Sequence, residues 1–148
     1  MDAKTAYEQL VAWSKETSLL GSVMGVLGWD QRVTMPPNAT PYRAEQFALL
    51  SRLIHERTTD PRVGEWLQIV EQSDLVADPE SDSAVNIRQW RRRYNRMTKL
   101  PTELVAEFTR VTAIAEKAWE QAREKSDFAH FKPHLEKIVA LVREIAER

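Results

Sequence analysis

The 148-residue sequence contains no cysteine and only four glycines. Its formal net charge is −1 at pH 7. Without cysteine the chain has no disulfide, no thiolate zinc site and no cysteine nucleophile, and we expect it to reside in the reducing cytoplasm. A net charge near zero favours neither nucleic acid nor a membrane surface as a partner. The balance of 43% hydrophobic and 29% charged residues indicates a folded chain rather than a disordered one.

Long apolar runs are also missing. The most apolar stretch, residues 19–29, is about half as long as the roughly 20 residues that a membrane span needs. The N-terminus carries acids and lacks the cationic and then apolar order of a secretory signal. The length is that of one ordinary domain, and we expect residues 1–148 to form a single helical domain or fragment.

The sequence has only four glycines and seven prolines, and the prolines lie at segment edges, which favours helices joined by short turns. Apolar residues recur at helical spacing in six segments, and no segment alternates as a strand would. The predicted helices begin near Lys4, Pro41, Pro61, Pro79, Thr102 and Pro133. The predicted fold class is therefore all-α, an irregular bundle of about six helices.

The apolar stripes of these helices predict which faces are buried. The clearest stripe, between Thr102 and Lys125, consists of Leu104, Phe108, Val111, Ala115, Trp119 and Ala122. In the helix from Pro41 to Arg57, the predicted stripe is Phe47, Leu50, Leu53 and Ile54. In the first helix, Gly21, Gly25 and Gly28 would allow another helix to approach closely. The last pattern reaches Ile145 without a C-terminal cap, so we expect the sequence to stop inside a helix.

Histidines are the first candidates for a metal site. His130 and His134 have the i, i+4 spacing of a zinc-binding H-E-x-x-H helix. Phe131 stands where the glutamate should be, and we expect Pro133 to interrupt the helix between the two imidazoles. We therefore predict no metal site in this chain. No G-x-S-x-G turn or glycine-rich phosphate loop is present either, so no catalytic residue is assigned.

A basic run is the second candidate feature. It consists of Arg88, Arg91, Arg92, Arg93, Arg96 and Lys99, with Trp90 and Tyr94 interleaved and no acid among them. A solvated or salt-bridged face is the first interpretation, a charged groove wall for an anionic or peptide ligand the second, and a nucleic-acid face the third.

The stretch around Asp30 is the third candidate, because an acid near the C-terminal end of a helix faces the negative end of the helix dipole. In the structural interpretation, Trp29 fills a gap between helices, and Asp30 accepts hydrogen bonds from the backbone or from an arginine such as Arg43. In the functional interpretation, Asp30 and Gln31 line a cleft.

Three stretches carry a resemblance to a known family: LGWDQRVTMPPNATPYRAEQFALLSRLIHE, VNIRQWRRRYNRMTKLPTELV and DFAHFKPHLEKIVALVRE. The first contains Trp29-Asp30-Gln31, then Met35-Pro36, and Arg43 to Gln46 opening the next helix. In order and spacing these stretches resemble the N-terminal part of the Taq-type thermostable metallocarboxypeptidases.

This resemblance implies an all-helical, usually homodimeric enzyme that is built around a long groove. Such an enzyme removes residues from peptide C-termini with a bound zinc-type ion, zinc or cobalt. The H-E-x-x-H helix, the third metal ligand and the arginines that receive the substrate carboxylate lie downstream in the family. The resemblance therefore implies no cofactor and no catalytic residue within these 148 residues.

Within that family, these N-terminal helices resemble a lid and side wall of the groove. The residues of this wall or structural signature would be Trp29, Asp30, Gln31, Met35, Pro36, Arg43 and Gln46. The first three would lie at the turn between the first two helices. The run of Arg88, Arg91, Arg92, Arg93 and Arg96 would form a basic wall or a supporting salt-bridge network.

Two hypotheses follow for the function. In the first, the chain is the N-terminal segment of a metal-dependent carboxypeptidase, is inactive alone, and meets peptide substrate only through the parent enzyme. In the second, it is a stand-alone, non-catalytic helical module for binding or dimerisation. A wall built against a larger partner would leave apolar faces uncovered, so we expect a homo-oligomer, with no nucleic-acid or membrane partner.

Overall fold

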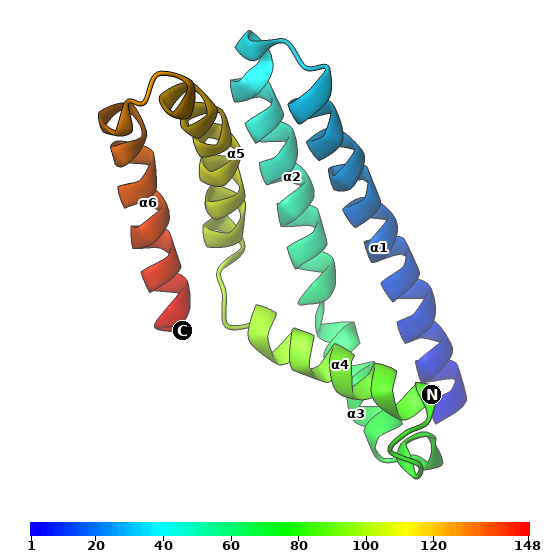
Figure 1. The fold of residues 1–148 in the computed structure, drawn as a ribbon. Coiled ribbons are helices and arrows are strands. Elements are labelled where there is room, and N and C mark those ends of the chain that lie inside the picture. Colours follow the sequence, from blue (N-terminus) through cyan, green and yellow to red (C-terminus); the bar gives the residue numbers. More distant parts are fainter. The chain divides into compact units, whose positions relative to one another are not determined.

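The computed structural model describes residues 1–148, which form six α-helices and no strand (Figure 1). The α-helices are α1 (Ala3–Val33), α2 (Thr40–Thr58), α3 (Pro61–Glu71), α4 (Asp82–Met97), α5 (Thr102–Glu124) and α6 (Phe128–Ala146). Two short 3₁₀ turns, η1 (Pro37–Ala39) and η2 (Asp74–Val76), precede α2 and α4. The all-α prediction is confirmed. None of the helices combines the length and the apolar character that crossing a bilayer would require.

The chain divides into two compact units. The first unit contains Met1–Leu20 and Ile54–Lys99, and the second contains Gly21–Leu53 and Leu100–Arg148. The boundary between them falls inside α1 and again inside α2. Each unit therefore combines segments that are distant in the sequence.

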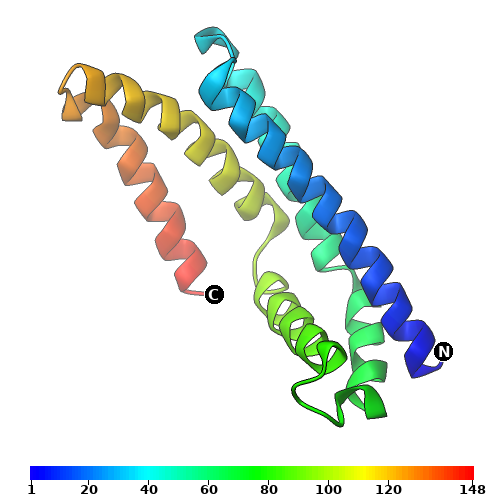
Figure 2. The same cartoon turned by 45° about the vertical axis from the view of Figure 1, so that its right-hand side comes forward.

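The first unit has a compact apolar core. Its buried members are Ala6, Leu10, Val63, Trp66, Leu67, Val70 and Ile87. Aromatic side chains extend this core, since the ring centroids of Trp13 and Trp66 lie 5.9 Å apart in an edge-on arrangement. Helix α3 begins at Pro61, as predicted, and Asp60 caps it by accepting from the Arg62 N–H at 2.9 Å. Figure 2 shows α3 and α4 packed as neighbours in this unit.

The second unit is packed through small side chains. Ala44, Ala48 and Ser51 are buried on α2, and the buried residues of α5 include Ala106, Ala113, Ala115, Ala118 and Ala122. The Thr109 hydroxyl donates to Ser51 Oγ at 2.9 Å, which joins the two helices. The predicted apolar stripe of α2 is wrong at Leu53, which is 39% exposed, because small residues on another face allow the closer approach.

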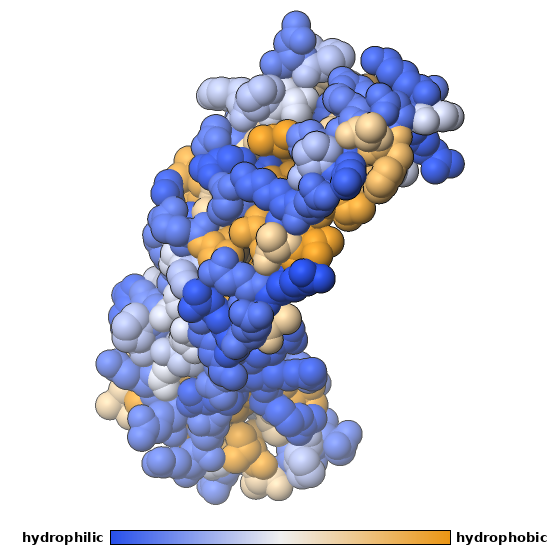
Figure 3. All heavy atoms as spheres, turned by 90° about the vertical axis from the view of Figure 1, so that its left-hand side faces the viewer, coloured by the Kyte–Doolittle hydropathy of each residue, from blue (hydrophilic) through white to orange (hydrophobic).

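Helix α5 follows its predicted stripe at Leu104, Val111, Ala115 and Ala122, which are buried. Trp119 departs from it, because its side chain is 47% exposed. An antiparallel α6 packs against α5 (Figures 1 and 2) but has no fully buried residue. We call Leu135, Val139 and Val142 the outer seam of α6, because these residues are exposed at i, i+4 and i+7. Figure 3 shows apolar surface on the side where α6 lies.

Two predicted helix starts are wrong. Helix α6 begins at Phe128, and Pro133 lies inside it. Asp127 caps this helix by accepting from the His130 N–H at 3.2 Å. Pro133 is the sixth residue of the helix, and it lacks the N–H that would otherwise donate to the Ala129 carbonyl oxygen. Helix α4 begins at Asp82 with Ser81 as its cap, because Asp78 closes a preceding turn instead.

No helix of this chain packs closely against the glycines of α1, so the expectation of close packing there is wrong within this chain. A Cβ at Gly21 or Gly25 would meet nothing within 4 Å, and one at Gly28 would lie 3.9 Å from Phe47. Gly64 in α3 differs, because a Cβ there would lie 2.7 Å from the Tyr94 hydroxyl. Gly64 is thus the only glycine at which a larger residue would collide with a neighbouring side chain.

We predict opposite effects for alanine at two helical glycines. Gly25→Ala should raise the free energy of unfolding by about 1 kcal/mol, because alanine favours helix and the site is open. Gly64→Ala should lower it by about 2 kcal/mol, because the new methyl group collides with Tyr94. Urea denaturation followed by circular dichroism measures both changes. A Gly64→Ala variant as stable as Gly25→Ala would contradict the packing of α3 on α4.

Candidate functional site

The last turn of α1 contains the Trp29-Asp30-Gln31 stretch, rather than the turn after it. The Asp30 carbonyl oxygen accepts from the N–H groups of Thr34 at 3.0 Å and Met35 at 2.9 Å, which ends the helix. The exposed Pro36 follows and leads into η1. The Asp30 carboxylate is thus placed beside the helix end that repels it.

Arg43 of α2 resolves this unfavourable placement. Its side chain is buried, and its Nη2 lies 2.5 Å from Asp30 Oδ2. The same guanidinium donates to the Leu27 carbonyl oxygen through Nη1 and to Gln46 Oε1 through Nε at 2.8 Å. One cation therefore binds both the Asp30 carboxylate and the Leu27 carbonyl oxygen near the C-terminal end of α1. The contact between Asp30 and Arg43 that the structural interpretation proposed is present.

The pKa of the Asp30 carboxyl is lowered from the ordinary aspartate value of 3.8. The largest cause is the hydrogen bond from the Thr34 hydroxyl, followed by the hydrogen bond from Arg43 and the charge of Arg43, while desolvation acts in the opposite direction. Asp30 is therefore ionised at neutral pH, as the ion pair requires.

Gln31 points to α5 instead. Its Nε2 lies 3.4 Å from the Ala113 carbonyl oxygen and 3.4 Å from Glu116 Oε2. The neighbouring Arg32 pairs with Glu116 at 2.6 Å, so Gln31 and Arg32 together fix the end of α1 to α5. The Gln31 Oε1 atom is buried and has no hydrogen-bond partner. A groove of about 380 Å³ lies beside this contact, lined by Met24, Gly25, Gly28, Arg32, Phe47, Thr109, Thr112, Ala113 and Glu116.

Trp29 lies outside this network. Its indole is 59% exposed, so the interpretation that it fills a gap between helices is wrong within this chain. Met35 is half-buried. Of the predicted signature, the structure brings Asp30, Arg43 and Gln46 together, directs Gln31 to α5, and leaves Trp29 on the surface.

The basic run of α4 separates into two faces. Arg91 forms a bidentate pair with Glu71, with N–O distances of 2.7 and 2.8 Å, and this pair supports the packing of α4 on α3. Arg88 donates to the Pro79 carbonyl oxygen at 3.2 Å. Arg92, Arg93 and Arg96 are exposed. Arg91 thus belongs to the predicted salt-bridge network, whereas the other cations face solvent.

The residues of this chain do not fit a metal site. No three His, Asp or Glu side chains lie close enough together to hold an ion. The His130 and His134 rings are 6.5 Å apart on one continuous helix, and His130 Nε2 contacts Gln121 Oε1 at 3.3 Å. His55 is buried, with Nε2 3.1 Å from the Met97 carbonyl oxygen.

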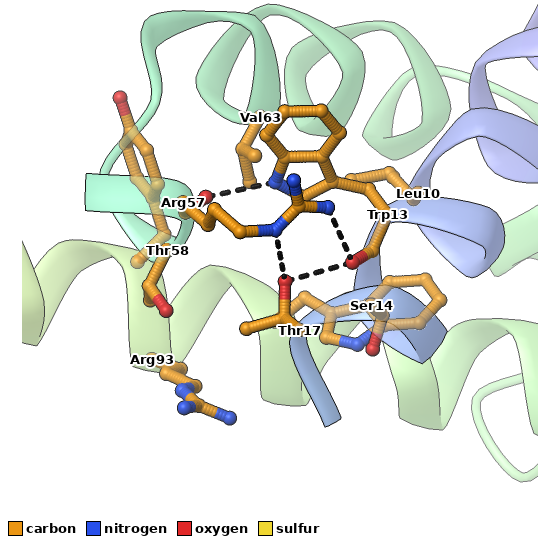
Figure 4. A pocket seen from close by; sticks show the side chains of 10 residues that line it. Leu10, Trp13, Ser14, Thr17, Arg57, Thr58, Val63 and Arg93 are labelled. Atoms are coloured by element: carbon orange, nitrogen blue, oxygen red, sulfur yellow. Dashed lines mark hydrogen bonds between the residues drawn. The ribbon is translucent and has the colours of Figure 1, made fainter. Parts of the chain in front are cut away.

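A small pocket in the first unit was not foreseen from the sequence (Figure 4). Arg57 stacks on the Trp13 indole at 3.8 Å, pairs with Glu16 at 2.7 Å, and donates to Thr17 Oγ1 at 3.2 Å. The Trp13 indole N–H in turn donates to the Arg57 carbonyl oxygen at 2.8 Å. The volume is about 50 Å³, room for a few waters, and the Nε and Nη2 donors of Arg57 are engaged within the protein. No spacing signal in the sequence joins Trp13 to Arg57.

Comparison with known proteins assigns the family. Residues 9–148 match the model of the family described as Carboxypeptidase Taq (M32) metallopeptidase. The chain belongs to this family. The resemblance seen in the three sequence stretches is therefore confirmed, and with it the parentage in a family of metallopeptidases.

Individual relatives agree with this assignment. The chain is 44% identical over 147 residues to thermostable carboxypeptidase 1 of Thermus thermophilus, covering 99% of this chain and 29% of that protein. It is 31% identical to thermostable carboxypeptidase 1 of Pyrococcus furiosus, covering 95% of this chain and 28% of that protein. The crystal structure of BsuCP superposes with a TM-score of 0.88 at 27% identity, over 95% of this chain and 28% of that one. The chain thus spans less than a third of the length of these relatives.

We predict that Arg43→Gln lowers the free energy of unfolding by about 2 kcal/mol at neutral pH, since it removes the guanidinium donors from the Asp30 carboxylate and from the Leu27 carbonyl oxygen. Arg52→Gln is the matched control, because its contact with Glu103 is 3.9 Å long and exposed, and it should cost less than about 0.5 kcal/mol. Urea denaturation measures both changes.

The same variant has an expected pH dependence. The Asp30 pKa is lower in the folded state, so the stability that its carboxylate contributes is fully present above pH 3.8 and is lost as the pH falls through the folded-state value. The difference between the original chain and Arg43→Gln should therefore shrink below pH 3.8. A difference that stays constant in acid would contradict the ion pair as its cause.

Proposed function

We propose that this chain is the N-terminal segment of a metal-dependent carboxypeptidase that releases C-terminal amino acids from peptides. Within that enzyme, residues 1–148 form a helical lid and side wall of the substrate groove, and they do not catalyse the reaction alone. The observation that carries the proposal is the 44% identity to a thermostable carboxypeptidase over 147 residues, in a family of metallopeptidases.

The metal and the catalytic groups belong to the rest of the enzyme in this proposal. The chain has no cluster of side chains that would fit a metal, and it covers only 29% of the Thermus thermophilus relative. We assign zinc, or cobalt in its place, to that other part. The contribution of this chain is to position α1, α2 and α5 through Arg43 and Glu116, so that the wall keeps a fixed shape.

Uncovered apolar faces support the role of a wall. In the second unit, helix α1 exposes a row of large side chains, namely Val23, Val26, Trp29 and Val33. The outer seam of α6 is a second such face. Single exposed apolar residues are ordinary, but contiguous rows mark surfaces that another polypeptide covers. We propose that a second copy covers part of them, which makes the protein a homo-oligomer, and that a chain without cysteine works in the cytoplasm.

We predict that the purified 148-residue chain releases no C-terminal amino acid from peptide substrates, with zinc or cobalt added. The reason is that no group of its side chains can hold the ion. Amino-acid release is measured by mass spectrometry, with the full-length Thermus thermophilus relative as the positive control. Metal-dependent release by the chain alone would overturn the proposal. A stable monomer without activity would instead favour the stand-alone module.

Self-association should depend on the outer seam of α6. We predict that Val139→Glu with Val142→Glu weakens association by about 100-fold, because two charges would have to be buried in the contact. Ala129→Glu with Ala140→Glu is the matched control, since it adds the same charge at exposed positions of α6 outside the seam. Sedimentation velocity measures the association. Equal weakening in both variants would exclude the seam as the contact.

A further inference from the structure

The outward face of α4 carries an uninterrupted set of cations. Arg88, Arg92 and Arg96 are exposed at successive i, i+4 positions, and Arg93 flanks them; we call these four residues the outer strip of α4. No acidic residue occurs between Asp82 and Glu103, so the strip has no neutralising neighbour along its own helix. Like charges at this spacing destabilise a helix, which makes the arrangement costly unless an anion offsets it.

The other arginines of the first unit show what is unusual here. Arg57, Arg62 and Arg91 each have a carboxylate oxygen at 2.7 Å, from Glu16, Asp60 and Glu71 respectively. No residue of the outer strip has a carboxylate within ion-pair distance, and Figure 4 shows Arg93 without a hydrogen bond to the side chains around it. The helix dipole can stabilise the positive charge of Arg96 only, because Arg96 is the only arginine in the last turn of α4.

The aromatic residues within the run are directed inward. Trp90 packs against Tyr7 at 5.7 Å between ring centroids, and Tyr94 lies against Gly64. Arg88, Arg92 and Arg96 therefore offer guanidinium groups without a stacking platform, and only Arg93 lines the small pocket beside Trp90 and Tyr94. Single-stranded nucleic acid is bound by cations together with aromatic faces. This chemistry favours carboxylates over nucleic acid as the ligand.

We propose that the outer strip of α4 is a docking surface for an acidic peptide segment of another polypeptide. Successive arginines of the strip are spaced by about 6 Å along the helix axis. An extended peptide places every second side chain about 6.6 Å apart on one face. A segment with acids at alternate positions thus matches the strip in charge and in spacing, and each guanidinium can bind one carboxylate in a bidentate manner. This surface stands apart from the proposed carboxypeptidase role and does not depend on it.

The test uses the whole 148-residue chain and a fluorescently labelled peptide with glutamate at alternate positions. Fluorescence anisotropy should detect binding that weakens as salt is added, and the same peptide with glutamine should not bind. The variant Arg92→Gln/Arg93→Gln/Arg96→Gln should bind at least about tenfold more weakly. The control Lys4→Gln/Lys15→Gln/Arg143→Gln removes three cations at other exposed positions and should change the affinity by less than about twofold.

Three results would overturn the proposal. The glutamine peptide could bind as well as the glutamate peptide, the control variant could lose as much affinity as the strip variant, or the strip variant could lose none. A single-stranded oligonucleotide that binds more than about tenfold tighter than the peptide at the same salt would assign the strip to nucleic acid instead. Circular dichroism of each variant ensures that a loss of binding is not a loss of folding, since all substituted side chains are exposed.

Discussion

The second unit depends on the guanidinium of Arg43. A helix as long as α1 ends in carbonyl groups without intrahelical donors, and here an aspartate adds a full negative charge at the same end. Arg43 donates to the Asp30 carboxylate and to the Leu27 carbonyl oxygen in the preceding turn, and its Nε donates to Gln46 Oε1. The buried cation and the partly buried carboxylate offset each other's desolvation cost, so removal of either one would leave the other charge uncompensated. This contact sets where α1 stops and how α2 follows it.

Small side chains then decide how close the helices of this unit come. Alanines on α2 and α5, with Ser51 and Thr109 bonded between them, allow backbones to approach without large interlocking residues. The first unit uses the opposite solution, a core of Trp66, Leu67, Val70 and Ile87 with aromatic rings around it. A packing surface of small residues buries little apolar area, which leaves larger side chains of α1, α5 and α6 for other contacts.

The chain therefore has three kinds of surface. Ion pairs such as that between Arg91 and Glu71 reinforce helix contacts inside a unit. Apolar rows on α1 and α6 need another polypeptide to remove them from water. We propose that an anion binds the outer strip of α4. The relatives are more than three times as long as this chain, and we propose that the apolar rows are covered within a larger helical enzyme.

Helix periodicity in the sequence predicted the all-α class and the six helices, because these depend on local spacing along the chain. The three motif stretches also identified the family. The sequence proposed Arg43 as a partner of Asp30 only as one of several options, since an ion pair across a turn has no spacing rule.

Other features were decided by tertiary packing. The buried alanine face of α2 and the exposed Trp29 depend on which neighbour a face meets, and hydrophobicity along one helix does not encode that neighbour. The division of the basic run into a paired Arg91 and an unpaired outer strip has the same cause, because Glu71 comes from a different helix. Local patterns thus determined the elements, whereas contacts between distant segments determined which of their faces were buried, paired or left open.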